Sequence, residues 1–563
     1  MILGIDVGGT HTDAVLIDHF RLLKKAKVPT DPDNLLTSLL EVTTELVDEE
    51  GIDQLEKVVL STTISTNAIV QHKVDPVGIM AVSGPGLPPA LLQLGPNTHI
   101  LSGYLNHRGI EIARIDRDEA TRIASRFHSE GIRNVALIGK FSTRNPKQEL
   151  ELQEIVRKHL PEQFQHVSLG HRMSGRLNFP RRIATTYLNE AIWRPYQRFV
   201  SQVLRFVHER KISIPIYILK ADGGTFDITQ SMEFPVQTIL SGPAASIMGI
   251  LATAGCCSDA IALDIGGTTT DIALFADGVP LLEAFGVTIE GHRTLIRGLR
   301  TKSIGVGGDS VIRLQEGKIL IGPEREGAAA ACGGPFPTPT DAMIVLGSTG
   351  IGDAEKAADA LAPIAAQLDC SVVEAARRIF NETCRKIAAH VRAVLDEINN
   401  QPVYTIHEML DGKKLNPRTL YVVGGPAGPL APELGRLLDC EVHIPIHAEV
   451  ANAIGAALAR TTAEITLIAD TERRTLSIAE EGLQTSIPPD FTMEDAIRIG
   501  TEKLRSKVLT MGDAEEEPQI EVAEAQEFNM VRDYYTSGKN IRVKLQVKPG
   551  CIGDLKRGET LCR

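Results

Sequence analysis

Residues 3–17 read LGIDVGGTHTDAVLI: an apolar run, an Asp, a glycine pair with hydroxyl residues, and a second apolar run. This order predicts two strands joined by a tight turn whose tip carries no bulky side chain. The glycine pair permits positive φ and lets backbone N–H groups approach an anion closely, and the Thr hydroxyls add donors. Asp6, at the end of the first strand, can hold a cation through water. The stretch favours a phosphate with its Mg²⁺, an ion that keeps several waters and takes few protein carboxylates.

The same pattern returns at residues 263–274, which read LDIGGTTTDIAL. A shift of 258 residues superposes Asp6 on Asp264 and gives seven identities in eleven positions. One glycine-rich turn is commonly no more than a hairpin turn, but two copies are hard to explain by turn chemistry alone. The duplication predicts two similar domains that face each other across a nucleotide.

The composition indicates a globular protein of several domains. The 563 residues exceed the roughly 250–300 that a single core usually holds. The net charge of −12 offers no basic surface for a polyanion, so nucleic acid is a poor partner. The eight cysteines lack the spacing of a zinc site or a disulfide framework. No apolar run approaches the roughly 20 residues of a membrane span, and we expect a cytoplasmic protein.

A hydroxyl-rich segment, STTISTNA (61–68), follows a short predicted strand and precedes a helix. Two interpretations stay open for it. The residues either cap the helix or present donors to a substrate or phosphate, and capping accounts for one hydroxyl better than for five of them plus Asn67.

Two further glycine clusters follow apolar segments. Residues 303–310 read SIGVGGDS, and residues 420–428 read LYVVGGPAG. In the second cluster, a backbone without side chains at the end of a strand suits an adenine or ribose lying flat against it.

Strands alternating with helices predict an α/β protein with mostly parallel sheets. Apolar residues at helical spacing predict a long helical stretch over 179–211, which Pro195 should kink or split. The clearest amphipathic helix is predicted over 372–398. From residue 461, short strands, a helix near 493–507 and the acidic run 513–518 suggest a separate α+β appendage.

Together these motifs resemble the hydantoinase A/5-oxoprolinase family, within the superfamily of actin, sugar kinases and heat-shock ATPases. The resemblance spans about residues 1–460, or roughly four-fifths of the chain. It rests on segments that occur in order: DVGGTHTDAV (6–15), STTISTNAIV (61–70), VSLGHRMS (167–174), ADGGTFDI (221–228), LSGPAASIMG (240–249), LDIGGTTTDIAL (263–274), SIGVGGDSVI (303–312), PTPTDAMIVLG (337–347) and VVGGPAGPLA (422–431).

The resemblance implies two facing ribonuclease H-like ATPase domains with a nucleotide cleft, over residues 1–175 and 176–460, followed by an appendage over 461–563. It implies ATP and Mg²⁺ as cofactors, with Asp6 and Asp264 organising the metal and the attacking group. The implied residues fall into three groups: catalytic Asp6, Asp264, Thr10 and Thr268; nucleotide-binding Gly8, Gly9, Thr12, Gly266, Gly267, Thr269, Gly307, Gly308, Gly424 and Gly425; and substrate-contacting Thr63, Asn67 and Asp309. Asp13 and Asp271 either join the site or cap their own turns.

The implied activity is phosphorylation of the carbonyl oxygen of a cyclic amide or related compound, which activates it for ring opening. Two alternatives stay open: a subunit of an ATP-dependent ketone carboxylase, and an ATP-driven conformational switch without small-molecule chemistry. The expected partners are a small carbonyl substrate, a hydantoinase B-type subunit and further copies of the chain.

The chain departs from the family pattern at several positions. His11 stands where the family usually has Phe, and Asp309 interrupts the usual Gly-Gly-Ser. Arg300-Thr301-Lys302 occupies the place of an Asp-x-His, and Asn178-Phe179-Pro180-Arg181 that of a Glu-containing run. These positions lie on the substrate side in the family, so the nucleotide function carries over better than the substrate does.

Overall fold

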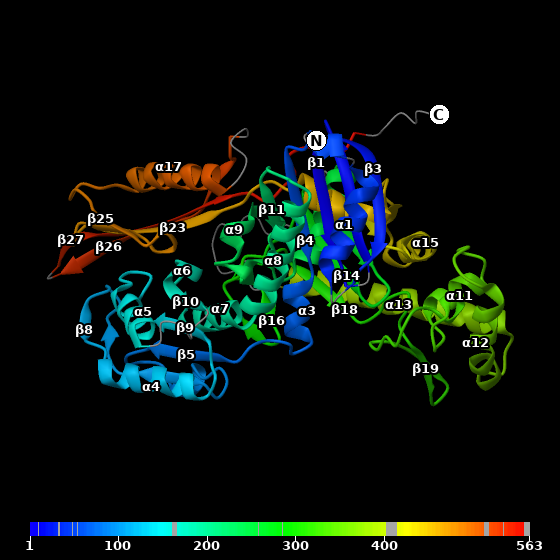
Figure 1. The fold of residues 1–563 in the computed structure, drawn as a ribbon, viewed down its shortest axis with the longest axis horizontal. Coiled ribbons are helices and arrows are strands. Elements are labelled where there is room, and N and C mark those ends of the chain that lie inside the picture. Colours follow the sequence, from blue (N-terminus) through cyan, green and yellow to red (C-terminus); the bar gives the residue numbers. More distant parts are fainter. Residues whose placement is uncertain are drawn as a thin grey trace.

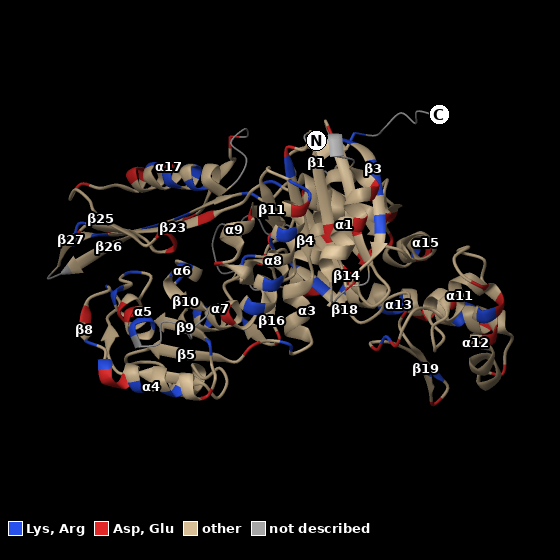
Figure 2. Cartoon of the chain, viewed as in Figure 1, with Lys and Arg blue, Asp and Glu red and all other residues tan. Residues whose placement is uncertain are grey.

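The computed structural model describes residues 1–9, 11–31, 34–47, 49–52, 54–159, 166–256, 258–283, 285–400, 414–511, 517–532 and 534–556. Two sheets form the centre of the molecule, an inserted domain lies to one side, and a C-terminal sheet extends above that domain (Figure 1). Basic and acidic side chains are interspersed over all of these parts (Figure 2). Within the described residues, every helix is too short or too polar to cross a membrane.

The first central sheet carries the first hairpin. Its strand order is β12-β11-β4-β1-β2-β3, with β1, β2 and β3 antiparallel and β1, β4 and β11 parallel. The strands are β1 (Ile2–Val7), β2 (His11–Asp18), β3 (Arg21–Pro29), β4 (Lys57–Thr62), β11 (Ile216–Leu219) and β12 (Thr225–Asp227). Residues 216–227 therefore complete a sheet that begins at residue 2. The predicted domain division at residue 176 stays a prediction.

The second central sheet repeats this arrangement around the second hairpin. Its order is β15-β14-β13-β21-β22, and β18 pairs antiparallel with β14 as β3 does with β2. The strands are β13 (Ala260–Ile265), β14 (Thr270–Ala276), β15 (Val279–Pro280), β18 (Thr301–Ile304), β21 (Thr419–Val423) and β22 (Glu441–His443). The predicted duplication is confirmed, because the order β3-β2-β1-β4-β11 matches β18-β14-β13-β21-β22 strand by strand.

Two helices cross between the central sheets. Helix α10 (Ser241–Ala254) packs against strands of both sheets, and α16 (Ala451–Leu458) packs on the first. A Cβ added to Gly249 would lie 2.1 Å from the Ala451 carbonyl oxygen, and one added to Gly455 would lie 2.1 Å from that of Ala245. Only glycine allows this approach.

The inserted domain is a four-stranded parallel sheet of order β10-β9-β5-β6. Its elements are β5 (Val77–Val82), β6 (Thr98–Leu101), β7 (Tyr104–Leu105), β8 (Glu111–Ala113), α4 (Arg117–Ser129), β9 (Asn134–Gly139), α5 (Lys147–His159), β10 (His166–Leu169) and α6 (Gly170–Met173). It is therefore a parallel α/β unit, as the alternation of strands and helices predicts.

The long helical stretch is split, as predicted. Helix α7 (Phe179–Ala191) ends at Ile192 and α8 (Trp193–Glu209) begins immediately after it. Pro195 lies in the first turn of α8, where its missing N–H leaves no helical hydrogen bond unmade. The predicted amphipathic helix is α13 (Val372–Asn399).

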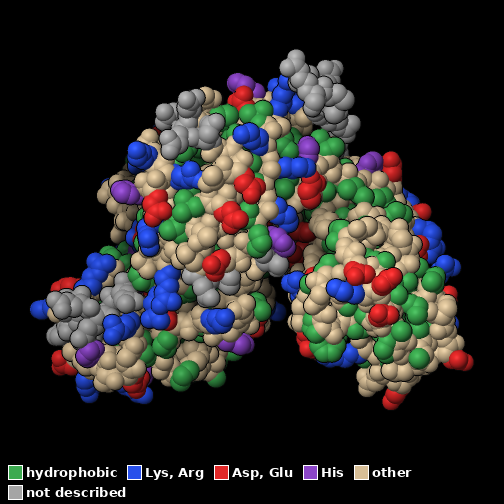
Figure 3. Space-filling model, turned by 45° about the vertical axis from the view of Figure 1, so that its right-hand side comes forward, with side chains coloured by type: hydrophobic (Ala, Val, Ile, Leu, Met, Phe, Trp, Pro, Cys, Tyr) green, Lys and Arg blue, Asp and Glu red, His purple; other side chains and the backbone are tan. Residues whose placement is uncertain are grey.

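The remaining helices and short strands cover the central sheets or extend from the second one. They are α1 (Leu35–Leu46), α2 (Glu49–Ile52), α3 (Ile64–Val70), α9 (Ile228–Ser231), β16 (Thr288–Ile289), β17 (His292–Arg293), β19 (Ile312–Gln315), β20 (Lys318–Ile321), α11 (Pro339–Val345), α12 (Ala354–Gln367) and α15 (Ala427–Leu438). A deep hollow separates the lobe of α11, α12 and β19 from the rest of the molecule (Figure 3).

The C-terminal region is a five-stranded antiparallel sheet of order β25-β24-β23-β27-β26, with one helix, α17, packed on it. Its elements are β23 (Glu464–Asp470), β24 (Thr475–Ile478), β25 (Leu483–Ser486), α17 (Met493–Met511), β26 (Ile520–Arg532) and β27 (Tyr535–Val547). The expected α+β appendage is present, and most of the acidic run 513–518 lies outside the described residues.

Candidate nucleotide and active site

The crossing helices connect the two hairpin carboxylates. The Asn452 side chain on α16 donates to Asp6 Oδ2 at 3.3 Å. The Ser246 hydroxyl on α10 lies 2.9 Å from Asn452 Oδ1 and also contacts Asp264 Oδ2. Four side chains thus form one chain of polar contacts. It joins Asp6 to Asp264, although these residues are 258 positions apart in sequence.

The two hairpin turns have the same hydrogen bond. The Gly8 N–H donates to the His11 carbonyl at 3.0 Å, and the Gly266 N–H donates to the Thr269 carbonyl at 2.9 Å. The second turn also holds Gly267, and the first holds Gly9. Thr10 lies outside the described residues, so its predicted role stays a prediction.

Burial changes the protonation of these carboxyls. Asp6 is 5% exposed, and burial raises its pKa to about 6. Burial also raises the pKa of Asp264. Asp6 Oδ1 is buried and has no hydrogen-bond partner within the described residues. Because a buried carboxylate oxygen normally has a partner, a cation or its water fits this place.

The described residues contain no group of three or more His, Cys, Asp or Glu side chains placed to hold a metal ion. Mg²⁺ needs no such group when phosphates and water supply most of its ligands. Asp6 and Asp264 therefore fit Mg²⁺ bound with a nucleotide better than an ion held by protein alone.

A cation that the sequence analysis missed lies beside the first hairpin. Lys27 Nζ on β3 is 3.0 Å from Asp13 Oδ1. Asp13 is nevertheless buried enough that its pKa is raised. Partial burial lowers the pKa of His11 at the hairpin tip, and both Lys27 and Arg325 act in the same direction. Arg325, which belongs to the second hairpin's surroundings, thus acts electrostatically on the tip of the first hairpin.

The predicted glycine cluster 307–308 lies on the second hairpin. The Gly308 N–H donates to the Gly266 carbonyl at 2.9 Å, and the Asp309 N–H donates to the Gly267 carbonyl at 2.7 Å. A Cβ added to Gly307 would lie 2.6 Å from the Gly266 carbonyl oxygen. The loop is therefore held backbone to backbone against the turn.

Arg325 closes the tip of the second hairpin. It lies 3.0 Å from Asp309 Oδ2 and donates to the Thr268 hydroxyl at 3.3 Å. Asp309, which the resemblance implies as a substrate contact, is thus placed beside the second phosphate turn. Its predicted role remains to be tested.

Gly424 and Gly425 follow β21 and lie next to Asp264. Gly424 has a φ of +97°, and an added Cβ would lie 2.8 Å from Asp264 Oδ1. A Cβ added to Gly425 would meet nothing within 4 Å. The position is open, as a surface for an adenosine requires.

In the segment 61–68, the N-cap residue Thr63 makes no side-chain capping hydrogen bond, and two of the hydroxyls contact another part of the chain instead. The Leu240 N–H donates to the Thr66 hydroxyl at 2.9 Å, and the Ser65 hydroxyl lies 2.7 Å from that of Thr238. These two hydroxyls hold the chain that leads into α10. Asn67 donates to the Thr63 hydroxyl at 3.2 Å and lies beside Gly9, so this pair remains available to a ligand at the first hairpin.

Thr12 adjoins the first turn, but its side chain contacts another segment. It is fully buried, and its hydroxyl is 3.0 Å from that of Thr30. Its counterpart Thr270 is also buried and donates to the Val306 carbonyl at 2.7 Å. These contacts give both residues a structural part in holding the third strand or loop against the hairpin.

The fold and the site together define a two-domain α/β protein of the ATPase type, with one glycine-rich hairpin from each domain. The particular family follows from the sequence. The chain belongs to the hydantoinase/oxoprolinase family: residues 2–160 match the hydantoinase/oxoprolinase N-terminal region, and residues 182–465 match the hydantoinase/oxoprolinase domain.

Curated relatives include the caprolactamase alpha subunit of Pseudomonas jessenii, 26% identical over 450 residues that cover 71% of this chain and 63% of the relative. The acetophenone carboxylase gamma subunit of Aromatoleum aromaticum is 25% identical over 61% of this chain and 53% of its own length. The 5-oxoprolinase of Saccharomyces cerevisiae is 28% identical over 46% of this chain and 20% of its own length. The chain thus spans less than two thirds of the length of these relatives.

Solved structures share the whole fold. Nucleotide-free acetone carboxylase superposes with a TM-score of 0.75 at 18% identity, over 99% of this chain and 88% of the other. The ATP-dependent caprolactamase of Pseudomonas jessenii superposes with a TM-score of 0.74 at 20% identity, over 100% of this chain and 90% of the other.

Proposed function

We propose that this chain is the ATP-binding subunit of an enzyme that activates a cyclic amide for ring opening. The observation that carries the proposal is the chain of hydrogen bonds from Asp6 through Asn452 and Ser246 to Asp264. This chain connects the two glycine-rich hairpins, which would each bind phosphate. Relatives named for caprolactam and 5-oxoproline support a lactam as the substrate class.

In this proposal, the N–H groups at both hairpin tips bind the β- and γ-phosphates from opposite sides. Asp6 and Asp264 would hold Mg²⁺ through water, and the bound ion would neutralise charge on the phosphates. Lys27 lies beside the first hairpin with a half-exposed ammonium group and would add a further positive charge. Gly424 and Gly425 would line the adenosine.

The reaction transfers the γ-phosphoryl group to the carbonyl oxygen of the amide and releases ADP. Water then attacks the activated carbon, and the ring C–N bond breaks as the protonated amine leaves. A second water hydrolyses the resulting acyl phosphate, which releases phosphate and the carboxylate. An amide carbonyl is a poor electrophile at neutral pH, so the free energy of ATP is spent on making its oxygen a leaving group. The protein contributes position and charge.

The chain would act with a second subunit. Its relatives include the alpha, beta and gamma subunits of multi-subunit enzymes by name. We infer a hydantoinase B-type partner, which would receive the activated carbonyl compound.

A ketone carboxylase subunit is the second candidate, because the acetone carboxylase and acetophenone carboxylase chains share this fold or sequence. The two candidates share the phosphoryl transfer and differ in the attacking group. Bicarbonate takes the place of water in the second.

The test is ATP turnover measured against lactams, hydantoins and small ketones, with and without the co-encoded partner. Turnover stimulated by a lactam supports the first candidate, and turnover that needs a ketone and bicarbonate supports the second. Slow hydrolysis that no carbonyl compound stimulates would contradict both and favour a conformational switch.

A further inference from the structure

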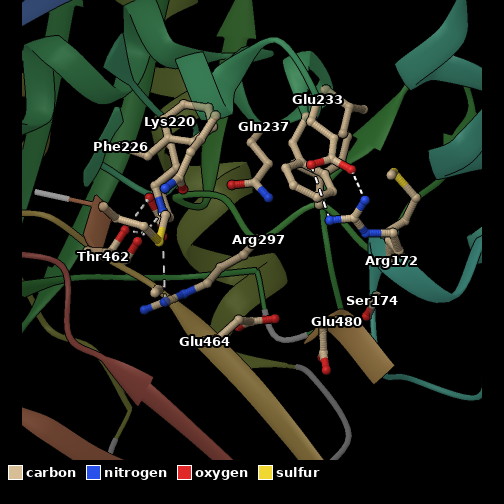
Figure 4. Close-up of a pocket in the computed structure, with 18 of the residues that line it drawn as sticks. Arg172, Ser174, Lys220, Phe226, Glu233, Gln237, Arg297, Thr462, Glu464 and Glu480 are labelled. Carbon is tan, nitrogen blue, oxygen red and sulfur yellow. Dashed lines mark hydrogen bonds and ion pairs between the residues drawn. The ribbon is translucent and has the colours of Figure 1, made fainter. Parts of the chain in front are cut away.

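A cavity of about 370 Å³ lies where four parts of the chain meet. Its walls come from α6 of the inserted domain, the segment after β11, the loop that precedes β18, and the C-terminal sheet with α17 (Figure 4). None of the hairpin residues lines it. The volume is in the range of pockets that hold small organic ligands.

Most charges that line this cavity cancel in pairs. Each of three lining carboxylates has a cation within ion-pair distance. The pairs are Glu233 with Arg172, Glu481 with Lys507 at 2.5 Å, and Glu464 with Lys544 at 2.7 Å. These pairs contribute no net charge to the space, so the remaining ionised groups decide what it attracts.

One corner keeps a net positive charge. Asp222 is buried between two cations, with Lys220 Nζ at 3.7 Å and Arg297 Nη1 at 3.5 Å. Two cations share one carboxylate there. Arg297 Nε is also buried without a hydrogen-bond partner within the described residues. The corner therefore fits one more carboxylate.

The opposite side holds a further carboxyl group, that of Glu480, whose pKa is raised by burial. Glu480 lies across the cavity from Lys220 (Figure 4), and in the described part of the chain it has no cation within 4.0 Å. It is held in place by the Gly175 N–H, which donates to Glu480 Oε1 at 2.8 Å. A ligand cation would be the first to pair with it.

Part of the lining is apolar. Phe226, Phe234 and Leu295 contribute to it, and the Gln237 amide points into the space (Figure 4). An apolar stretch between a positive and a negative site matches a chain of methylene groups with a carboxylate at one end and an ammonium group at the other.

We propose that this cavity binds a small ω-amino acid, with the carboxylate at Arg297 and Lys220 and the ammonium group at Glu480. Each end of the ligand would then satisfy a charge that the protein leaves uncompensated. The apolar chain would cover the aromatic wall and exclude water from both ion pairs.

The connection to the reaction rests on the proposed function, because ring opening of a lactam produces an ω-amino acid. The cavity also adjoins both crossing helices in sequence. Gln237 lies four residues before α10, which carries Ser246, and Thr462 lies four residues after α16, which carries Asn452. A product in the cavity would thus lie against the segments that hold the two hairpins together.

Binding is tested by calorimetry on the full chain without nucleotide. The probes are ω-amino acids of increasing chain length, with fatty acids and alkylamines of equal length. We expect saturable binding at one optimal length, with the amino acid bound at least about tenfold more tightly than either singly charged compound.

Two variants assign the ends of the ligand. Arg297→Gln should weaken binding of the amino acid and of the fatty acid by about tenfold and leave binding of the alkylamine unchanged. Glu480→Gln should weaken binding of the amino acid and of the alkylamine only. Arg293→Gln, on the exposed strand β17, is the matched control and should bind as wild type. Melting temperatures measured without ligand establish that each variant is folded. Gln237→Trp, which fills the cavity, provides a second test and should abolish binding of the amino acid.

Failure of every probe to bind would overturn the proposal, as would equal weakening of all probes by both variants. Neither result depends on ATP turnover. An enzyme that hydrolyses lactams but binds no amino acid here would retain the proposed function and lose this site. If the chain binds the amino acid here but lactams do not stimulate ATP turnover, the site would be kept and the proposed function would be lost.

Discussion

In the first hairpin, Asp13 faces Lys27 on the neighbouring strand, and in the second hairpin the residue at the equivalent place beside Asp271 is Ser303. The second hairpin instead has an ion pair, Arg325 with Asp309, at its tip. The backbones and carboxylates of the two copies match, but their charge compensation does not. The two copies share their glycine-rich turns, but the supporting cation lies at the side of one hairpin and at the tip of the other.

The positive charges are therefore placed unequally around the two hairpins. Lys27 lowers the pKa of Asp264 across the cleft, although burial still raises that pKa overall. One lysine therefore acts on carboxylates of both copies. If the asymmetry matters for phosphoryl transfer, equivalent substitutions in the two hairpins should have unequal effects.

The largest loss of activity is expected from substitution of the aspartate that the two hairpins have in common. Asp264→Asn and Asp6→Asn should each reduce kcat for ATP hydrolysis by at least about 10²-fold, because each removes a charge that organises the metal and phosphates. The measurement is steady-state phosphate release, with melting temperature as the control for folding. Near-normal turnover in either variant would remove that carboxylate from the site.

A smaller effect is expected where the copies differ. Lys27→Met should lower kcat/KM for MgATP by about 10- to 100-fold, mainly through KM, whereas Ser303→Ala should stay within about twofold of wild type. The loss should shrink as salt is added, because the lysine is half exposed and screened. Equal effects of the two substitutions would show that the hairpins are electrostatically equivalent.

The tip of the second hairpin offers a finer test. Arg325→Gln leaves Asp309 without its cation beside a phosphate turn, and we expect KM for MgATP to rise by about tenfold. Asp309→Asn removes only the carboxylate that pairs with Arg325 and keeps the cation beside the turn, so KM should change by less than about threefold. If Asp309→Asn had the larger effect, and changed the KM for the carbonyl substrate instead, Asp309 would be the substrate contact that the family resemblance implies.

The sequence predicted the parts of this site that are local. Asp6, Asp264 and the glycine clusters at 307–308 and 424–425 could be recognised because each follows an apolar strand within a few residues. The split of the helical stretch near Pro195 is equally local. A proline has the same consequence for a helix in any fold.

The parts that the sequence did not reveal depend on pairing over long distances. Lys27 meets Asp13 only through the register of β2 and β3, which shifts between Leu16 and Ile17. Ser246 and Asn452 lie on helices whose small residues indicated no more than close packing, and their contact exists because those helices cross. The run Lys24-Lys25-Ala26-Lys27, which follows the first hairpin closely and for which no strand was predicted, was the signal that could have pointed to Lys27.

The smallest effect is expected on stability, from a substitution of Asp271. This carboxyl has Ser303 on the neighbouring strand where Asp13 has Lys27, so its substitution measures the free-energy cost of burying the carboxyl without that cation. Burial, with Asp264 nearby, raises the pKa of Asp271 to about 7. A carboxyl whose pKa rises on folding holds its proton more tightly in the folded chain, so it destabilises the fold increasingly as the pH rises from the ordinary Asp range to about 7. Asp271→Asn should therefore raise the free energy of unfolding by on the order of 1 kcal/mol at about pH 8 and have little effect at about pH 4.

The corresponding change in the first copy should not stabilise the protein, because Asp13→Asn also removes the ion pair with Lys27. Urea unfolding at both pH values measures the difference, and ATP turnover distinguishes the two meanings that Asp271 can have. If Asp271→Asn gains stability and keeps most of its turnover, the second carboxylate of the hairpin is a relic of the duplication whose cation has been lost. If turnover falls with that of Asp264→Asn, Asp271 belongs to the reacting site, and its raised pKa marks a group placed there to exchange a proton.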